Sequence, residues 1–198
     1  MGKIVVLDSG HGGMIGGIYQ TAGKRSPNYA KGVLYEGVFN RWVVNRVKEE
    51  LDRLKIPYFH ISPEDRDVSL ETRVIRANNI YRKNKNTYIL SVHANAGGGE
   101  GVEGFTTKGY TGSDQIGEII LSNLENDLVG QRMRFDRSDG DKDKEVNYYI
   151  LRKPIMSAFL LECGFMDNEA DYNNLWDRVY MDTLVDSLVK SIKQIYES

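Results

Sequence analysis

Three side chains able to bind a metal or carry a proton stand where apolar, strand-like runs of the sequence end. His11 follows the first such run and lies between glycines, His93 ends a second run, and Glu162 ends a third. The flanking glycines let the backbone turn sharply and leave the His11 imidazole approachable. In an open α/β sheet, ligands collect outside the carboxyl ends of parallel strands, so we expect these three side chains to converge on one crevice.

Glu36 adds a fourth candidate by a different route, because it heads a helical pattern. At about 100° per residue it lines up with Val43, Val47 and Leu54, on the apolar stripe that should face the sheet. One interpretation is a favourable interaction with the positive end of the helix dipole, worth about 0.3–1 kcal/mol. An unpaired carboxylate is costly to bury, however, and its place at the head of the buried stripe favours a metal ligand.

The combination of His11, Glu36 and His93 indicates a metal site more strongly than any one of them. A single histidine is more often a hydrogen-bonded structural residue. Two histidines and one glutamate, however, form the three-ligand set of catalytic zinc sites, with the fourth position left for water or substrate. A carboxylate outside that set can take a proton from the attacking water, and we assign this role to Glu162. The sequence therefore predicts metal-assisted hydrolysis.

Four further polar residues have open or structural interpretations. Asn95 can hydrogen-bond a ligand or the substrate, or satisfy a turn, and Arg73 can orient a ligand carboxylate or form a surface ion pair. His60 lies in a strand-like run with no glycine turn beside it, so we interpret it as structural. Cys163 suggests a thiol nucleophile, but buried free cysteine usually acts as a small apolar residue, and Glu162 already accounts for this strand end.

Short apolar runs alternate with longer helical patterns along the chain, which is typical of an α/β protein. The sequence predicts three layers: a mainly parallel or mixed central β-sheet of about six strands, flanked by helices on both faces. The expected strands are 3–7, 58–61, 88–92, 102–107, 148–151 and 158–161, and the expected helices are 36–54, 70–82, 114–128 and about 175–196.

Two segments lack apolar periodicity and are predicted to be irregular. The first, 12–34, is rich in glycine, and the second, 131–145, is dense in charge and carries Asp139-Gly140-Asp141. Both fit solvated surface loops. For the charged segment a second interpretation stays open, a flexible rim of a substrate groove.

Length and composition fit a single catalytic domain over residues 1–198. Lys and Arg total 26 against 28 Asp and Glu, a net charge of −2, so no basic field draws the chain to nucleic acid. No apolar stretch approaches the about 20 residues that span a bilayer, so we expect no membrane insertion. The apolar run at the N-terminus is too short for a signal peptide, so we expect a chain made in the cytoplasm, unless a leader was removed. No feature of the sequence indicates a protein partner.

Several ordered motifs, each on an expected strand end or helix start, resemble the zinc-dependent N-acetylmuramoyl-L-alanine amidases of the type with a central sheet and a two-histidine, one-glutamate metal site. The resemblance covers nearly the whole chain. It departs between Gly12 and Glu36, where the family often has a short Asp-Pro-Gly-like segment and this chain is longer, which bears on substrate contacts and not on the ligands. The matching motifs are Asp8-Ser9-Gly10-His11-Gly12-Gly13, Glu36 at a helix start, Leu70-Glu71-Thr72-Arg73 with Ala77-Asn78, Ser91-Val92-His93-Ala94-Asn95-Ala96, and Leu161-Glu162-Cys163-Gly164-Phe165-Met166-Asp167-Asn168.

The resemblance implies one Zn²⁺ per chain and a defined target, the amide bond between the lactyl group of N-acetylmuramic acid and the first L-alanine of the stem peptide. Peptidoglycan is then the expected partner and the cell wall the place of action. Such a chain fits a bacteriolytic phage endolysin as well as a trimmed, secreted or remodelling enzyme. Two other classes stay open: a zinc metallopeptidase or carboxypeptidase acting within the stem peptide, and a non-catalytic peptidoglycan-binding module. The module should lack the ligands or Glu162, whereas all four residues are present.

Overall fold

A six-stranded sheet lies at the centre of the computed structural model, which describes residues 2–138 and 140–198. The strand order is β4-β1-β5-β8-β6-β7. The first four strands are parallel, β6 is antiparallel to β8, and β7 is parallel to β6. The strands are β1 (Ile4–Ser9), β4 (Tyr58–His60), β5 (Thr87–Asn95), β6 (Glu103–Thr107), β7 (Lys144–Val146) and β8 (Ala158–Phe165), with β2 (Met14–Ile15) and β3 (Ile18–Tyr19) in a separate hairpin. The helices are α1 (Glu36–Leu54), α2 (Leu70–Lys83), α3 (Gly112–Asp127), α4 (Tyr149–Arg152), α5 (Glu169–Asn174) and α6 (Arg178–Glu197).

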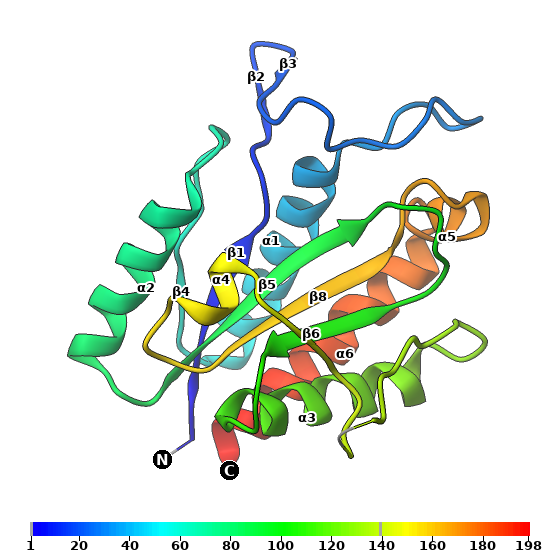
Figure 1. The fold of residues 1–198 in the computed structure, drawn as a ribbon. Coiled ribbons are helices and arrows are strands. Elements are labelled where there is room, and N and C mark those ends of the chain that lie inside the picture. The colour runs from blue at the N-terminus through cyan, green and yellow to red at the C-terminus, as the bar shows by residue number, and fades with distance from the viewer. Residues whose placement is uncertain (1, 139) are drawn as a thin grey trace.

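Helices cover both faces of this sheet (Figure 1). On one face, α1, α3 and α6 pack over a core that includes Leu7, Leu90 and Leu161 from the sheet. On the other face, α2 and α4 pack over Ile89 and Leu160. Adjacent residues of one strand enter different cores because successive side chains of a strand point to opposite faces. The predicted three-layer α/β fold with a mixed sheet is confirmed.

The helix that carries Glu36 begins and ends where the sequence predicts. α1 buries Val47 and Leu51 completely against the sheet. Its first turn approaches the segment after β1 so closely that a Cβ atom on Gly37 would lie 1.9 Å from the carbonyl oxygen of Gly12. Glycine at this position therefore allows the start of α1, with Glu36, to come close to the end of β1.

The prediction of a strand over 148–151 is wrong, since residues 149–151 lie in the short helix α4 and Tyr148 precedes it. Ile150 and Leu151 are both buried, in the same core as α2. A four-residue apolar run can bury its side chains either as a strand or as one helical turn, and periodicity alone does not separate the two. The strand at this edge of the sheet is β7, which the sequence analysis places in the charged loop.

The single helix expected over about 175–196 is in fact preceded by a separate short helix, and the main helix starts later. α6 begins after Asp177, whose side chain accepts a hydrogen bond from the backbone N–H of Tyr180. An aspartate in this position caps a new helix. The apolar periodicity of α6 continues backward to Leu175, and this continuity hides the boundary in the sequence.

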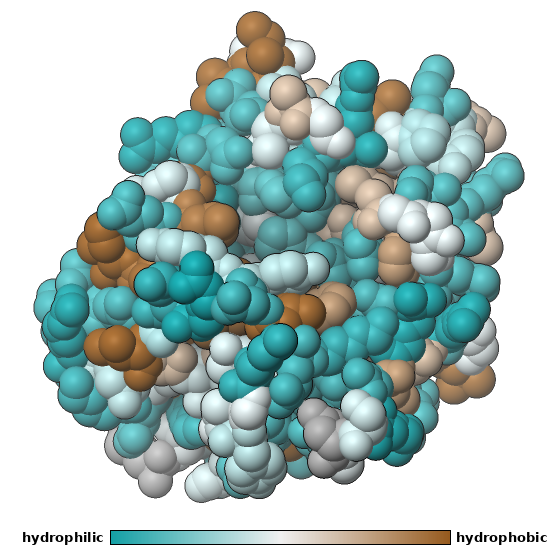
Figure 2. Space-filling view, viewed as in Figure 1, coloured by the Kyte–Doolittle hydropathy of each residue, from teal (hydrophilic) through white to brown (hydrophobic). Residues whose placement is uncertain are grey.

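The two segments predicted to be irregular are largely so. Within 12–34 the only strands described are the two-residue strands of the β2–β3 hairpin. The described residues of 131–145 form no helix, and only the last two, Lys144 and Glu145, belong to a regular strand, β7; Asp139 lies outside the described residues. The hairpin exposes Met14, Ile15 and Ile18, and Figure 2 shows hydrophobic surface at the top of the molecule, where Figure 1 places β2 and β3. Among the helices described, none has the length and apolar character needed to cross a membrane.

Candidate active site

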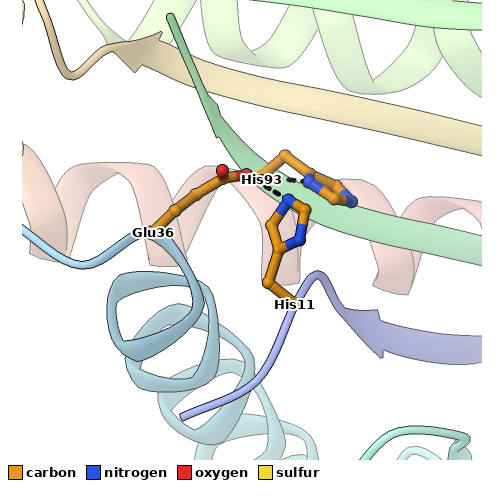
Figure 3. A group of neighbouring side chains, drawn as sticks. All are labelled: His11, Glu36 and His93. Atoms are coloured by element: carbon orange, nitrogen blue, oxygen red, sulfur yellow. Dashed lines mark hydrogen bonds and ion pairs between the residues drawn. The ribbon is translucent and has the colours of Figure 1, made fainter. Parts of the chain in front are cut away.

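Three of the four predicted side chains meet at the carboxyl end of the sheet (Figure 3). His11 follows β1, His93 lies near the end of β5, and Glu36 opens α1. Glu36 Oε1 lies 3.1 Å from His11 Nε2 and 2.9 Å from His93 Nδ1. One ligand atom of each residue lies within 4.8 Å of the others, so a single metal ion can bind all three. Two imidazole nitrogens and one carboxylate oxygen are donors that suit zinc and leave a fourth position open.

The turn after β1 lets the two imidazoles approach each other. The backbone of His11 has a φ of 63°, in the left-handed region that residues other than glycine rarely adopt. A Cβ atom on the preceding Gly10 would lie 2.2 Å from Cε1 of His93. The ring centroids of His11 and His93 are 5.1 Å apart, with their planes at 89°. Glycine at position 10 is therefore required for the His93 ring to lie against this turn.

A buried ion pair lies beneath the turn and holds its backbone. Arg73 donates to Asp8 Oδ1 at 2.5 Å, to the carbonyl oxygen of Ser9 at 2.6 Å and to that of His11 at 3.0 Å. Burial opposes ionisation of Asp8, but Arg73 and the hydrogen bond from Ser91 outweigh it, so the pKa of Asp8 is lowered. Arg73 thus fixes the main chain of His11, whereas the sequence analysis offered a ligand carboxylate or a surface ion pair.

Substitution of Arg73 tests this support. We expect Arg73→Met to lower the free energy of unfolding by about 3–5 kcal/mol, because it leaves the Asp8 carboxylate buried without its cation. Both side chains are 2% exposed, so solvent does not compensate. Arg76→Met is the matched control on the same helix, since Arg76 pairs with the more exposed Glu64. Equal losses for the two variants in urea unfolding would contradict the role of Arg73.

Glu162 lies next to His93 on the neighbouring strand, as its register partner. Its Oε2 atom is buried and has no hydrogen-bond partner. Burial raises the pKa of Glu162 to about 8, with His93 opposing the rise and Glu36 adding to it. The carboxylate does not belong to the three-residue group that can hold one ion. Its position beside the ligand set, and not in it, suits a group that accepts a proton.

The charges of the three clustered side chains are matched to a cation. Burial opposes ionisation of Glu36, but hydrogen bonds with His11 and His93 outweigh it and lower the pKa of Glu36. Burial also disfavours the charged form of His93, but Glu36 and Glu162 outweigh this and raise the pKa of His93. The surroundings therefore favour an ionised Glu36 with positive charge beside it, which a bound metal ion also provides.

Glu103 is a site neighbour that the sequence analysis missed. It is 4% exposed, is the register partner of Glu162 on β6, and forms ion pairs with Arg134 and Lys144. Asn95 donates to Glu103 at 3.1 Å, and its side-chain oxygen accepts from the next backbone N–H. The Asn95 side chain thus satisfies a turn and contacts a neighbouring carboxylate. The feature of the sequence that could have indicated Glu103 is its position as an acidic residue inside a strand-like run.

The two remaining candidates contact the site only indirectly. His60 Nε2 lies 3.1 Å from Ser9 Oγ, and burial lowers the pKa of His60 to about 4, so the ring is neutral at pH 7. The Cys163 side chain is fully buried, and burial raises its pKa. A protonated, inaccessible thiol is a poor nucleophile, which favours the structural interpretation of Cys163.

A cavity of about 420 Å³ is lined by His11 and His93 together with Leu70 and Ile150. A second groove of about 480 Å³ lies between α1 and α6 and is lined by Trp42 and Trp176, with none of the four candidate side chains in its wall. A bound molecule would therefore approach His11 and His93 through the first cavity.

Comparison with known proteins shows which family and fold the chain resembles. Residues 5–194 match the family model described as N-acetylmuramoyl-L-alanine amidase. The chain is 26% identical over 198 residues to the uncharacterized protein YqiI of Bacillus subtilis. This alignment covers 99% of this chain and 86% of that protein. It is 27% identical over 214 residues to an uncharacterized cell wall amidase of Bacillus anthracis, with 99% of this chain but only 36% of the relative covered. The crystal structure of N-acetylmuramoyl-L-alanine amidase from Clostridium difficile 630 has the same fold, with a TM-score of 0.80, 24% identity, and 100% and 98% of the two chains covered.

Proposed function

The chain belongs to the N-acetylmuramoyl-L-alanine amidase family, and from this premise we propose that it cleaves the amide bond between N-acetylmuramic acid and the L-alanine of the peptidoglycan stem peptide with one Zn²⁺ per chain. His11, Glu36 and His93 hold the ion, and Glu162 moves the proton. The single observation that supports this most is the convergence of one carboxylate oxygen and two imidazole nitrogens from three distant segments. The residues fit the metal by donor type, by spacing and by charge.

When bound by His11, Glu36 and His93, Zn²⁺ would supply Lewis-acid polarisation of the scissile carbonyl and would lower the pKa of water toward about 7. Glu162 accepts the proton from the attacking water through its free, buried Oε2 atom. Burial raises the pKa of this carboxyl to about 8, and the positive charge of an ion held beside it would favour the ionised form, which can accept a proton. Glu162 then gives the proton to the departing alanine nitrogen, since an unprotonated amine is a poor leaving group.

Three further residues position the proposed ligands and the residues next to them. Arg73 holds the carbonyl oxygen of His11, which fixes the turn from which this imidazole projects. Gly10 leaves room for the His93 ring. Glu103 draws Arg134 and Lys144 toward β6 beside Glu162, so the charged segment 131–143 and the start of β7 lie along one side of the proposed site. These contacts act on position, and we assign them no chemical step.

Digestion of purified peptidoglycan by the zinc-loaded protein tests the reaction. We expect mass spectrometry to detect intact stem peptides that begin with a free L-alanine amine, and glycan strands with an unsubstituted lactyl carboxylate. Release of stem fragments with L-alanine still joined to the sugar would support a zinc peptidase or carboxypeptidase instead. Binding to peptidoglycan without any cleavage, by protein whose zinc content is one per chain, would support a non-catalytic module.

Peptidoglycan is therefore the proposed partner, and the cell wall the proposed place of action. A bacteriolytic endolysin and a wall-remodelling enzyme both use this reaction. The two roles differ in the outcome of exposing intact cells to the protein from outside: rapid loss of turbidity supports a lysin, and stable turbidity with cleavage of isolated walls supports remodelling.

A further inference from the structure

Three aspartate side chains meet away from the histidine cluster, beside the edge of the sheet. Asp114 lies in the first turn of α3, and Asp141 and Asp143 lie in the charged segment just before β7. One carboxylate oxygen of each lies within 4.8 Å of the others. Most of α3 and the loop after it separate Asp114 from the other two aspartates in sequence. The fold therefore brings these carboxylates together.

Two of these carboxylates are buried and only half satisfied. Asp114 is 3% exposed and Asp143 is 1% exposed. One oxygen of Asp114 accepts the backbone N–H of Thr111 in a capping box, and one oxygen of Asp143 accepts the hydroxyl of Thr106 at 2.5 Å. The other oxygen of each, Oδ1, is buried without a hydrogen-bond partner. Helix capping therefore explains one oxygen of Asp114 and leaves its Oδ1 atom buried without a donor, while Asp143 lies beside the carboxyl group of Asp141.

The lysines that flank Asp143 in sequence do not neutralise it through a described ion pair. Lys142 pairs with Glu118 at 3.1 Å and Glu125 at 3.2 Å. Lys144 pairs with Glu103 at 2.8 Å, on the side of the proposed active site. Like charges this close together, two of them out of water, repel strongly unless a cation or proton lies between them.

We propose that Asp114, Asp141 and Asp143 form a binding site for a Ca²⁺ ion, separate from the zinc site. All the donors are oxygens, which hard divalent cations prefer, and the buried pair lacks the nitrogen or sulfur donors that select zinc. Aspartates at alternate positions of a loop, as at 141 and 143, are a common way to supply Ca²⁺ with carboxylates. Water and main-chain carbonyl groups complete the six to eight ligands that this ion takes.

The bound ion would fasten the charged segment to α3 and to the outer strands. Thr106, which donates to Asp143, lies on β6, and β7 starts one residue after Asp143. The same segment carries Arg134, and β7 begins with Lys144, the two cations that pair with Glu103 next to Glu162. Ca²⁺ therefore stabilises the side of the molecule that borders the proposed active site. This inference does not depend on the proposed function.

Thermal unfolding of the purified full chain, with zinc bound and calcium removed, tests the site. We expect CaCl2 at about 100 times its Kd to raise Tm by about 5–10 °C. Asp141→Asn and Asp143→Asn should each abolish this rise. The control Asp186→Asn, which removes one exposed carboxylate from α6, should retain it.

Without calcium, the Asp141→Asn variant should no longer be less stable than the unsubstituted chain. Asp141→Asn, whose side chain is partly exposed, removes one of the repelling charges, so it should unfold at the same Tm as the unsubstituted chain or higher. A wild-type Tm that does not respond to CaCl2 would overturn the proposal. So would a response that survives both cluster substitutions, or one that MgCl2 reproduces at the same concentration.

Discussion

Replacing Glu162 with glutamine should reduce the rate of amide hydrolysis by about 10²–10⁴-fold, the range that a positioned proton carrier supplies. Glutamine keeps the shape of the side chain and removes the ability to accept a proton. Because Glu162 lies outside the three-residue ligand group, the variant should still bind close to one zinc ion per chain. Release of stem peptide from purified peptidoglycan and the zinc content of the same sample are the two measurements.

Glu100→Gln is the control for Glu162. Glu100 lies in the loop between β5 and β6 and its side chain is 49% exposed, so the substitution removes a carboxylate near the same end of the sheet without touching the ligands. It should leave the rate within about twofold. Hydrolysis by Glu162→Gln at the wild-type rate would remove Glu162 from the mechanism, and loss of zinc from this variant would move Glu162 into the ligand set.

Replacing His93 with alanine should have a different effect, loss of the metal together with loss of activity. The variant removes one of three protein donors and leaves Glu36 beside a single imidazole. Removing a partner that only orients a ligand typically costs about 10–100-fold in metal affinity, so loss of a ligand should exceed that range. Competition with a zinc chelator of known affinity measures the change.

His60→Gln provides the matched histidine control. His60 hydrogen-bonds to Ser9 and lies outside the ligand group, so its variant should keep zinc at the wild-type affinity. Far-UV circular dichroism of both variants tests whether the sheet is intact, and we expect it to be, because the core beneath the site is apolar. A His93→Ala protein that retains stoichiometric zinc would show that this imidazole is not a ligand.

The positions of the four main candidates were predictable because they depend on local patterns. His11 follows β1, whereas β5 and β8 continue past the predicted strand ends, so that His93 and Glu162 lie in the second half of their strands, toward the carboxyl edge of the sheet. Glu36 heads a long apolar stripe whose phase is unambiguous over five turns. These patterns fix where each side chain stands on its own element, and the parallel arrangement of β1, β5 and β8 brings three of those ends to one edge.

The contacts that the sequence did not reveal all depend on distant partners. Arg73 and Asp8 form a buried pair across 65 positions, and no pattern around either residue indicates the other. Glu103 becomes part of the site only because β6 runs antiparallel to β8. The wrong prediction of a strand at α4 has a local cause instead. A run of four apolar residues is too short to distinguish the helical from the strand periodicity.

The backbone of His11 has a consequence for how the protein acquires its metal. A left-handed conformation in a residue other than glycine costs of order 1 kcal/mol, and hydrogen bonding from Arg73 to the carbonyl group maintains it. The polypeptide itself thus aims this imidazole, and 19% of its side-chain surface remains open to solvent. We therefore expect folding not to require the proposed ion, in contrast to small zinc domains that fold only around theirs.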